Sequence, residues 1–362
     1  MPLRFRKVLI ADERYEACGV FDVDGDGVLD IVSGAWWYQG PDFRRKHPVG
    51  PVAIEGEYFD DFASIPMDVN GNGRLDCITG AWWGKTLRWR ENPGDPSKEW
   101  PVHDIDVCGN IERPCAWDVD GDGRLEIVPN CPSSPLAVYK LVVDAKGKGT
   151  GRFSKTVVRA ENQAHGLGCG DVAGSGRMDF VLNNGWLEAP ADPWTQPWTW
   201  HPDFALFGFA STPILVADVN GDGLSDIIVG GGHEYGLDWW EQKKTGGKRA
   251  WVRHPIDPFN SQYHDMQWID IDGDGRAELV TGKRYRAHCD NDPGAFDDYG
   301  SYYFKWTGEG FAKQVIDYGR PRQGKGLGIY FETVDLTGNG LPDIVAPGKD
   351  GLYVFYNEGL VR

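Results

Sequence analysis

One nine-residue motif, first present as DVDGDGVLD from Asp22 to Asp30, recurs along the whole chain. Further copies follow about every 50 residues, a period typical of repeat architectures such as solenoids and propellers. They begin at Asp68, Asp118, Asp171, Asp218, Asp270 and Asp335. The chain is therefore expected to fold as seven similar units.

Each unit contains four short β-rich segments around this motif. In the fifth unit, TPILVADV precedes the loop, DIIVGG follows it, and LDWWEQ and the amphipathic WVRHPID come next. Four strands per period of this size is typical of a propeller blade. The 49 glycines and 16 tryptophans also suit short strands and tight turns. We predict an all-β fold: a seven-bladed β-propeller of four-stranded antiparallel blades, forming a single domain over residues 1–362.

The two chain ends predict how the ring closes. The last unit stops after its third strand, LYVFYNEG, near Asn357, whereas FRKVLIAD at residues 5–12 resembles a fourth strand without a blade. We expect this N-terminal strand to complete the last blade, which removes the exposed edges of an open sheet. A closed ring has no edge that must pair, so the oligomeric state stays open.

Charge and cysteine content exclude several classes of partner. The chain has 54 acidic and 37 basic side chains, a net charge of −17, which argues against nucleic acid and anionic membrane surfaces. No segment is long enough to span a membrane, and the apolar run from Val8 to Ala11 is too short for a signal peptide. Seven cysteines without a CxxC pair indicate reduced thiols and a cytoplasmic protein.

The repeated loops place several carboxylates around one turn, a spacing that suits Ca²⁺ and, less often, Mg²⁺. The loop at Asp171 has Ala173 and Ser175 at ligand positions and is expected to hold no ion. The alternative for every loop is a simple Asx turn, in which the side chain caps its own backbone. The best predicted structural sites are Asp22/Asp24/Asp26/Asp30, Asp118/Asp120/Asp122/Glu126, Asp218/Asn220/Asp222/Asp226 and Asp270/Asp272/Asp274/Glu278.

Three of the eight histidines map to one mouth of the central channel. His165 and His264 stand six residues before a leading Asp, and His233 follows a second strand, in blades four, six and five. All three are expected opposite the Asp-rich loops. Converging imidazoles can bind Zn²⁺ or a similar transition metal and leave positions open for substrate. The alternative for each is a hydrogen-bonded polar residue that lines a wet channel.

Other residues at the same mouth suggest acid/base and substrate-binding roles; no organic cofactor is expected. The tyrosines are candidate proton donors or acceptors, and the cations could stabilise an anionic or enolate-like group or simply form local ion pairs. The acid/base candidates are Tyr235, Tyr263 and Tyr285, the cations are Arg113, Lys283 and Arg284, and the substrate-binding candidates are Trp36, Trp82, Glu112, Asn184 and Trp186.

The DxDGDGxxD loop between two short strands, repeated seven times, resembles the FG-GAP/VCBS seven-bladed propellers. Within them, WRENPGDPSKEW (residues 89–100), AHGLGCGD around His165, GGHEYG around His233, and His264 resemble the propeller domain of fungal aldos-2-ulose dehydratase (1,5-anhydrofructose dehydratase) and related propeller polysaccharide lyases. The resemblance implies a metal held by these three histidines and β-elimination on a sugar. The fungal enzyme continues into cupin domains and this chain does not, so an isomerisation step is expected to be missing and the substrate stays open.

Three functions follow from these features. The first is a metal-dependent carbohydrate lyase or dehydratase that acts on a keto-sugar or a uronic-acid-containing glycoside, with a small sugar or oligosaccharide as partner. Elimination requires removal of a weakly acidic α-proton, and a metal ion or cationic cluster stabilises the resulting enolate. The alternatives are a non-catalytic glycan- or protein-binding propeller and a metal-assisted glycoside hydrolase.

Overall fold

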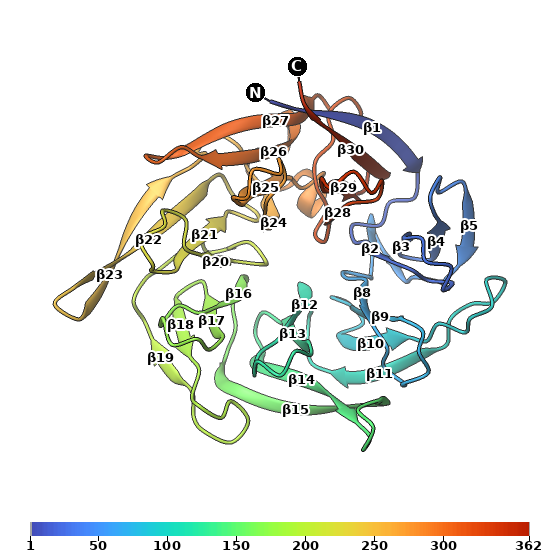
Figure 1. Ribbon diagram of the computed structural model, residues 1–362, viewed down its shortest axis with the longest axis horizontal. Coiled ribbons are helices and arrows are strands. Elements are labelled where there is room, and N and C mark those ends of the chain that lie inside the picture. The colour runs from blue at the N-terminus through green and yellow to red at the C-terminus, as the bar shows by residue number, and fades with distance from the viewer. Residues whose placement is uncertain (1, 362) are drawn as a thin grey trace.

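The computed structural model describes residues 2–361, and its strands form a ring of seven four-stranded sheets (Figure 1). Every sheet is antiparallel, and its strands follow chain order from the centre outward in the first six blades. Within the described residues, no helix has the length and apolar character needed to cross a bilayer. The all-β propeller prediction is therefore confirmed.

The first blade consists of β2 (Gly19–Phe21), β3 (Asp30–Ser33), β4 (Trp36–Gln39) and β5 (Arg45–Pro48). The second consists of β8 (Ile65–Met67), β9 (Asp76–Gly80), β10 (Thr86–Arg90) and β11 (Val102–Val107). The third consists of β12 (Arg113–Trp117), β13 (Glu126–Asn130), β14 (Pro135–Val143) and β15 (Gly149–Asn162). The fourth blade consists of β16 (Leu167–Gly170), β17 (Asp179–Leu182), β18 (Gly185–Glu188) and β19 (Thr199–His201). The fifth consists of β20 (Leu215–Ala217), β21 (Asp226–Gly230), β22 (Leu237–Thr245) and β23 (Lys248–Pro255). The sixth consists of β24 (Tyr263–Ile269), β25 (Glu278–Lys283), β26 (Tyr299–Trp306) and β27 (Phe311–Gly319). The seventh is β28 (Glu332–Val334), β29 (Asp343–Ala346), β30 (Leu352–Leu360) and β1 (Leu3–Ala11). A hairpin, β6 (Ile54–Glu55) and β7 (Tyr58–Phe59), and a short 3₁₀ turn, η1 (Ala287–Asp290), lie in loops.

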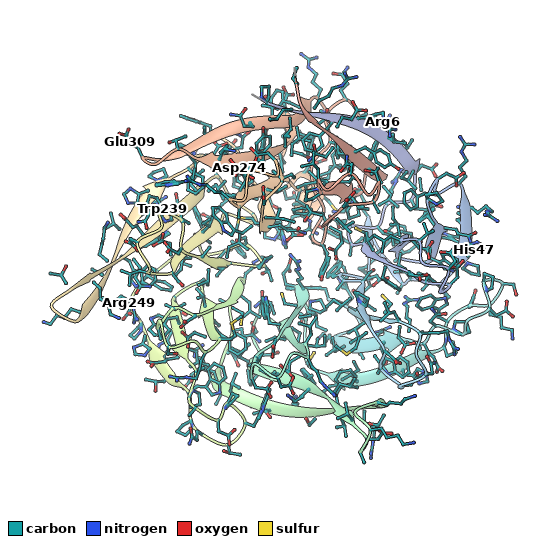
Figure 2. The ribbon with its side chains drawn as sticks, viewed as in Figure 1. Arg6, His47, Trp239, Arg249, Asp274 and Glu309 are labelled. Carbon is teal, nitrogen blue, oxygen red and sulfur yellow. The ribbon has the colours of Figure 1, made fainter. Side chains whose placement is uncertain are left out.

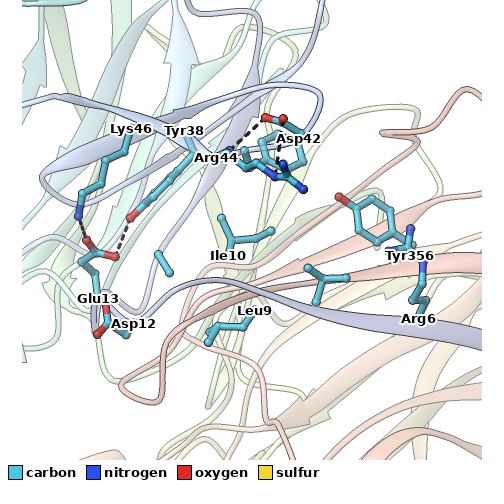
Figure 3. A pocket seen from close by; sticks show the side chains of 13 residues that line it. Arg6, Leu9, Ile10, Asp12, Glu13, Tyr38, Asp42, Arg44, Lys46 and Tyr356 are labelled. Atoms are coloured by element: carbon cyan, nitrogen blue, oxygen red, sulfur yellow. Dashed lines mark hydrogen bonds and ion pairs between the residues drawn. The ribbon is translucent and has the colours of Figure 1, made fainter.

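The ring closes as predicted, because β1 pairs antiparallel with β30 and places Val8 opposite Val354. A cavity of about 590 Å³ lies at this closure, between β1 and the first blade (Figure 3). Glu13 accepts a hydrogen bond from Tyr38 (2.9 Å) and pairs with Lys46 there. None of the site residues predicted from the sequence lines this cavity.

Hydrophobic side chains fill the spaces between neighbouring blades. Ile31 and Tyr38 of the first blade, for example, pack with Val345 and Val354 of the seventh. The second strands β9, β13 and β21 are buried along their whole length, and each large apolar side chain buried there contributes about 1.5–3 kcal/mol. Blade-to-blade packing therefore holds the ring, and the loops at its centre are built on rigid strands.

The Asp-rich loops form the Asx turns considered above. In the first loop, Asp22 accepts hydrogen bonds from the backbone N–H groups of Gly25 (2.7 Å) and Gly27 (2.9 Å). Both glycines have positive φ, 81° and 85°, which explains why the motif requires glycine. The ninth residue, Asp30, accepts from Val23 and Gly40 (2.8 Å each), so it joins the loop to the turn after the third strand.

Three of the four predicted calcium loops gather carboxylates closely enough to hold an ion, but with fewer residues than expected. Asp26, also predicted as a ligand of the first loop, lies outside the group of carboxylates that this loop brings together. Its exposed carboxylate accepts the backbone N–H of Val28 (2.8 Å) and so caps the loop's own turn. The three groups, each with ligand atoms within 4.8 Å of one another, are Asp22/Asp24/Asp30, Asp118/Asp120/Asp122 and Asp270/Asp272/Glu278.

The fourth predicted loop, in the fifth blade, brings its carboxylates together less closely, and the roles of Asn220 and Asp222 as ion ligands stay predictions. Asn220 donates its side-chain amide to Glu241 (2.9 Å) and to Asp222 (3.3 Å), and its side-chain oxygen accepts the backbone N–H of Asp222 (2.9 Å). Asp222 is exposed and accepts the backbone N–H of Leu224 (2.9 Å). Within residues 2–361, Asp218, Asp222 and Asp226 form no carboxylate group of the kind found in the other three loops.

Two of the four loops predicted to hold Ca²⁺ contain a lysine ammonium among their carboxylates. Lys140, on the third strand of the third blade, contacts Asp120, Asp122 (2.8 Å) and Glu126 (3.1 Å). Lys305 takes the same place in the sixth blade, with Asp272, Asp274 (2.6 Å) and Glu278 (3.5 Å). In the first blade the neutral Gln39 stands there instead and donates to Asp24 (2.9 Å). A cation in the third or sixth loop would have to displace lysine.

Candidate metal centre

Three histidines and one glutamate meet at the centre of the ring, where the inner strands converge (Figure 1). Glu112 and His165 lie just before β12 and β16, His264 lies in β24, and His233 lies in the turn after β21. One potential ligand atom from each residue lies within 4.8 Å of the other three, and all four side chains are buried. The three imidazoles thus lie together, as expected from their positions within the sequence repeats.

The three imidazole rings surround a common point. Their centroids are 5.0 Å apart for His165 and His233, 5.2 Å for His165 and His264, and 5.3 Å for His233 and His264. The ring planes are inclined by 80° to 90° to one another. Such an arrangement presents ring edges from three directions, as in a multidentate metal site.

Each imidazole uses one nitrogen as a donor to the surrounding protein. His165 Nδ1 donates to the carbonyl oxygen of Ala210 (2.7 Å), His233 Nδ1 to Asp292 (2.8 Å), and His264 Nε2 to Glu112 (2.7 Å). The second nitrogens of His233 (Nε2) and His264 (Nδ1) are buried and have no hydrogen-bond partner among residues 2–361, whereas His165 Nε2 lies 3.3 Å from Glu112 Oε1. Buried polar atoms are rarely left unpaired, and these lone pairs fit a bound cation.

The protonation states also suit a cation. Burial lowers the pKa of His233 to about 4 and that of His264 well below its ordinary value, although carboxylates oppose the shift. Burial alone would raise the pKa of Glu112, but His165 and His264 hold it well below its usual range. Near neutral pH the site therefore offers the neutral imidazoles of His233 and His264 and the ionised carboxylate of Glu112, the forms that ligate a metal.

Residues of the loop between β25 and β26 support the site through hydrogen bonds. Asp292 accepts a hydrogen bond from His233 Nδ1 and another from His288 Nδ1 (2.8 Å each). Although burial opposes it, these two histidines hold the pKa of Asp292 well below its usual range. A carboxylate behind a ligating histidine fixes the tautomer and the ring orientation. Neither Asp292 nor His288 was identified from the sequence.

A buried ion pair lies on the other side of Glu112. Arg284, which follows β25, binds Glu16 through Nε (2.8 Å) and Nη2 (3.2 Å), and its Nη1 lies 3.9 Å from Glu112. Lys349 lies 3.6 Å from Glu16. These contacts connect the first, third, sixth and seventh blades across the channel.

A pocket of about 150 Å³ adjoins the cluster at Glu112. Its walls carry four aromatic side chains, and Glu112, Arg284 and His288 contribute the polar groups. Aromatic faces with a few polar groups suit a sugar ring. The aromatic residues are Tyr58, Phe62, Trp82 and Trp83.

A larger recess of about 370 Å³ adjoins this pocket. Lys349 belongs to the recess and its Nζ lies 3.8 Å from the ring centroid of Tyr58, which lines the pocket. Arg14 and Arg322 are exposed and form no ion pair within the described residues, whereas Arg286 binds Glu57 (3.2 Å). This cation-rich recess is lined by four basic and three acidic side chains, the acids being Asp12, Glu57 and Asp350. Its two arginines without an ion pair can bind an anion in a protein of net charge −17.

Of the cations predicted from the sequence, Arg284 lines the pocket. Arg113 instead pairs with Asp265 and donates to the carbonyl oxygen of Thr212 (2.6 Å). Lys283 donates to the carbonyl oxygens of Gly294 and Asp297, the latter at 3.0 Å, and burial lowers its pKa to about 8. Arg113 and Lys283 thus hold neighbouring loops in place.

The predicted tyrosines are spread over different surroundings. Tyr235 is exposed and donates to Asp297 (2.5 Å). Tyr263 is buried in a blade interface and donates to Asp257 (2.7 Å). Tyr285 lines the cation-rich recess. The structure therefore does not bring these hydroxyls to the histidine cluster.

The predicted substrate-binding residues also separate. Trp82 lines the pocket and Glu112 belongs to the cluster. Trp36 packs at the first blade with Lys46 Nζ 4.6 Å from its ring centroid, and Trp186 is fully buried with its indole N–H on Asp203 (2.9 Å). Asn184 is exposed.

The remaining histidines, apart from His288, have a structural role in outer strands, as His47 at the rim illustrates (Figure 2). Four of them stack on a tryptophan of the neighbouring third strand, with centroid distances from 4.2 to 4.5 Å. Three also pair with a glutamate. The stacked pairs are His47 with Trp37, His103 with Trp89, His201 with Trp186 and His254 with Trp239, and the glutamates are Glu91, Glu188 and Glu241.

Comparison with known proteins identifies the class. The family model described as FG-GAP-like repeat matches residues 68–128 and 218–281. These two segments are FG-GAP-like repeats, and the seven sheets make the chain a seven-bladed β-propeller. No curated protein matches the sequence.

The chain is similar to several solved structures at low sequence identity. One is an Agrocybe aegerita lectin that recognises non-reducing terminal N-acetylglucosamine, with 16% identity, a TM-score of 0.48, and coverage of 99% of this chain and 94% of the lectin. Auxiliary nutrient binding proteins from Bacteroides ovatus and Bacteroides thetaiotaomicron have 11% and 12% identity and TM-scores of 0.44 and 0.40, with 98% of this chain and 77% of each covered. Because every score is below 0.5, no function is transferred from these structures.

Proposed function

We propose that the chain is a metal-dependent carbohydrate lyase or dehydratase that catalyses β-elimination on a sugar. One observation carries the proposal: the buried cluster of Glu112, His165, His233 and His264, within 4.8 Å, adjoins an aromatic pocket. Three imidazoles with one carboxylate suit Zn²⁺ or a similar ion. Bound there, such an ion would supply a Lewis acid that stabilises an enolate.

The pocket residues supply the other roles that elimination needs. His288 lines the pocket, and its Nδ1 is held by Asp292, which leaves Nε2 to take up or deliver a proton at the substrate. Arg284 faces the same pocket beside Glu112 and can orient a negatively charged oxygen. Trp82 and Trp83 provide faces for stacking a sugar ring.

The cation-rich recess supports a uronic-acid-containing glycoside over a neutral keto-sugar. A carboxylate on the sugar next to the reacting one would reach the recess lined by Arg14, Arg322 and Lys349. The same carboxylate chemistry makes the α-proton of a uronic acid removable once its charge is neutralised.

Metal content and product chemistry test the proposal together. Metal analysis of the native protein is expected to find about one transition metal per chain, lost in His165→Ala and retained in His201→Ala, whose imidazole lies in an outer strand. Uronic-acid oligosaccharides are then expected to give an unsaturated product, detected by the ultraviolet absorbance of its conjugated double bond. Absence of a transition metal from protein purified without chelators would contradict the metal centre.

The aromatic pocket favours one second candidate, a non-catalytic glycan-binding propeller. In that case His165→Ala would bind the oligosaccharide as the native protein does, and neither would release product. A hydrolase acting at the same cluster would instead generate new reducing ends without ultraviolet absorbance.

A further inference from the structure

Two cysteines from neighbouring blades lie in contact on the channel-mouth side of the ring. Cys108 follows β11 of the second blade and Cys131 follows β13 of the third, and their Sγ atoms are 3.7 Å apart. All seven cysteines are free thiols. Cys131 is buried, whereas Cys108 is partly exposed, so an oxidant in solution can reach one member of the pair.

The backbone around this pair already lies close enough for a covalent link. Next to Cys108, Gly109 approaches the third blade so closely that a Cβ atom there would lie 2.3 Å from Ser134 Oγ. Ser134 in turn donates its backbone N–H to the carbonyl oxygen of Cys131 (3.0 Å). The turns that follow Cys108 and Cys131 are thus in direct contact. Shortening the distance between the two Sγ atoms to the length of a disulfide bond needs a displacement of about 1.5–2 Å.

We propose that Cys108 and Cys131 form a reversible disulfide that links the second and third blades. The Cys108 thiolate attacks a small-molecule disulfide such as oxidised glutathione, forming a mixed disulfide and releasing one glutathione thiolate. Cys131 then loses its proton to that thiolate and attacks Sγ of Cys108, which releases the second glutathione. Two protein thiols are oxidised, and one glutathione disulfide is reduced to two thiols.

The electrostatics favour Cys108 as the attacking group. The hydrogen bond from Cys131 lowers the pKa of Cys108, although burial opposes the shift. Cys131 titrates in the opposite direction: its contact with Cys108 and its burial raise its pKa far above the ordinary value. One accessible thiol with the lower pKa and one buried resolving thiol form the arrangement of a redox pair.

The position of the pair connects it to the histidine cluster. Asn130 immediately precedes Cys131, and its carbonyl oxygen accepts the backbone N–H of Glu112 (2.8 Å). The side-chain oxygen of Asn130 accepts from the backbone of Gly166, next to His165 (3.1 Å). A bridge to Cys131 would therefore anchor the segment that positions two members of the cluster.

The test is a thiol count on folded protein equilibrated with oxidised glutathione, followed by peptide mapping without reductant. Native protein is expected to lose two of its seven thiols, to give one linked peptide containing Cys108 and Cys131, and to regain seven thiols with dithiothreitol. Cys131→Ser is expected to keep Cys108 unlinked to any protein thiol. Cys77→Ser, which removes a buried cysteine in another cluster, is expected to form the bridge normally.

Two results would overturn the proposal. One is a folded native protein that retains all seven thiols, or carries only a glutathione adduct, at equilibrium with excess oxidised glutathione. The other is a Cys108–Cys131 bridge that forms only in urea, because the link would then belong to the unfolded chain.

Discussion

The imidazoles of His233 and His288 lie parallel, with ring centroids 3.9 Å apart and planes inclined by 4°, and Asp292 accepts a hydrogen bond from each. The first ring belongs to the buried cluster, while the second lines the pocket and is half exposed. The backbone holding His288 is constrained, with positive φ at Arg286, His288, Cys289 and Asp290. Non-glycine residues in this region cost about 1–3 kcal/mol each and are concentrated at functional sites.

The first prediction concerns the carboxylate shared by these histidines. Asp292→Asn is expected to weaken Zn²⁺ binding about 10- to 100-fold, because His233 loses the charged acceptor that fixes its tautomer. Competition with a chromophoric chelator measures this affinity. Asp290→Asn is the matched control, since Asp290 lies in the same loop and pairs with Arg286 instead. Equal affinities for the native protein and Asp292→Asn would show that Asp292 does not support the cluster.

The second prediction concerns the ion pair between Glu16 and Arg284, both of which are about 4% exposed. Glu16→Gln is expected to lower the free energy of unfolding by about 3–5 kcal/mol at pH 7, since it leaves a buried guanidinium without its partner. Urea denaturation followed by tryptophan fluorescence measures the loss. The double variant Glu16→Gln/Arg284→Met is expected to recover part of it, because the unpaired guanidinium is gone and only the ammonium of Lys349 is left without this carboxylate.

The pH dependence of this ion pair follows from the pKa of Glu16. Burial alone would raise that pKa, but Arg284 and Lys349 lower it from 4.5 to about 2. A depressed carboxyl pKa stabilises the fold above the unfolded-state value, and the contribution is lost as the pH falls through the folded-state value. The stability difference between native protein and Glu16→Gln is therefore expected to be constant above about pH 5 and to shrink between pH 4.5 and pH 2. A difference that grew in acid would contradict the ion-pair explanation.

The sequence predicted the ring and the convergence of three histidines for one physical reason. A repeat fixes the position of a residue within its blade, so residues at equal offsets from the leading Asp face the same channel. His165 and His264 follow from that register. His288 and Asp292 could not be found this way, because the segment between β25 and β26 has no counterpart in the other blades.

Residues that share a motif can still differ in surroundings. GAWW occurs in the first and second blades, yet Trp36 lies within β4 while Trp82 lies in the turn before β10, which begins only at Thr86. The longer turn carries Trp82 into the pocket. The lysines within the third and sixth loops were missed because they come from the third strand, well after the loops that they neutralise.

The third prediction uses one of these lysines. Burial and the charge of Asp272 raise the pKa of Glu278 to about 7, and Lys305 offsets part of that shift. Lys305→Met is expected to raise the pKa further and to destabilise the fold by about 1 kcal/mol at pH 8. The penalty should be smaller at about pH 5, because Glu278 is then protonated in the folded state of both proteins. Their stabilities separate only as the pH rises through the native protein's folded-state pKa of about 7.

The same variant is also tested with added calcium. Added Ca²⁺ is expected to restore the melting temperature of Lys305→Met at about pH 8, since an ion can take the place of the ammonium among three carboxylates. Lys243→Met is the control, because Lys243 pairs with the single carboxylate of Glu241. No response to Ca²⁺ in Lys305→Met would indicate that the loop geometry, rather than the lysine, prevents ion binding.

The last prediction tests the pocket wall through the paired GAWW motifs. Trp82→Ala is expected to weaken binding of a uronic-acid oligosaccharide about 5- to 10-fold, because a sugar ring loses an aromatic face of the kind that contributes about 0.5–1.5 kcal/mol beyond buried area. Trp36→Ala removes the same residue type from the same motif, but its indole packs at the first blade with Lys46 over the ring. It should lower stability while leaving affinity unchanged. Isothermal titration calorimetry at a temperature where both variants are folded separates the two effects, and equal affinity losses in both variants would place the binding surface outside this pocket.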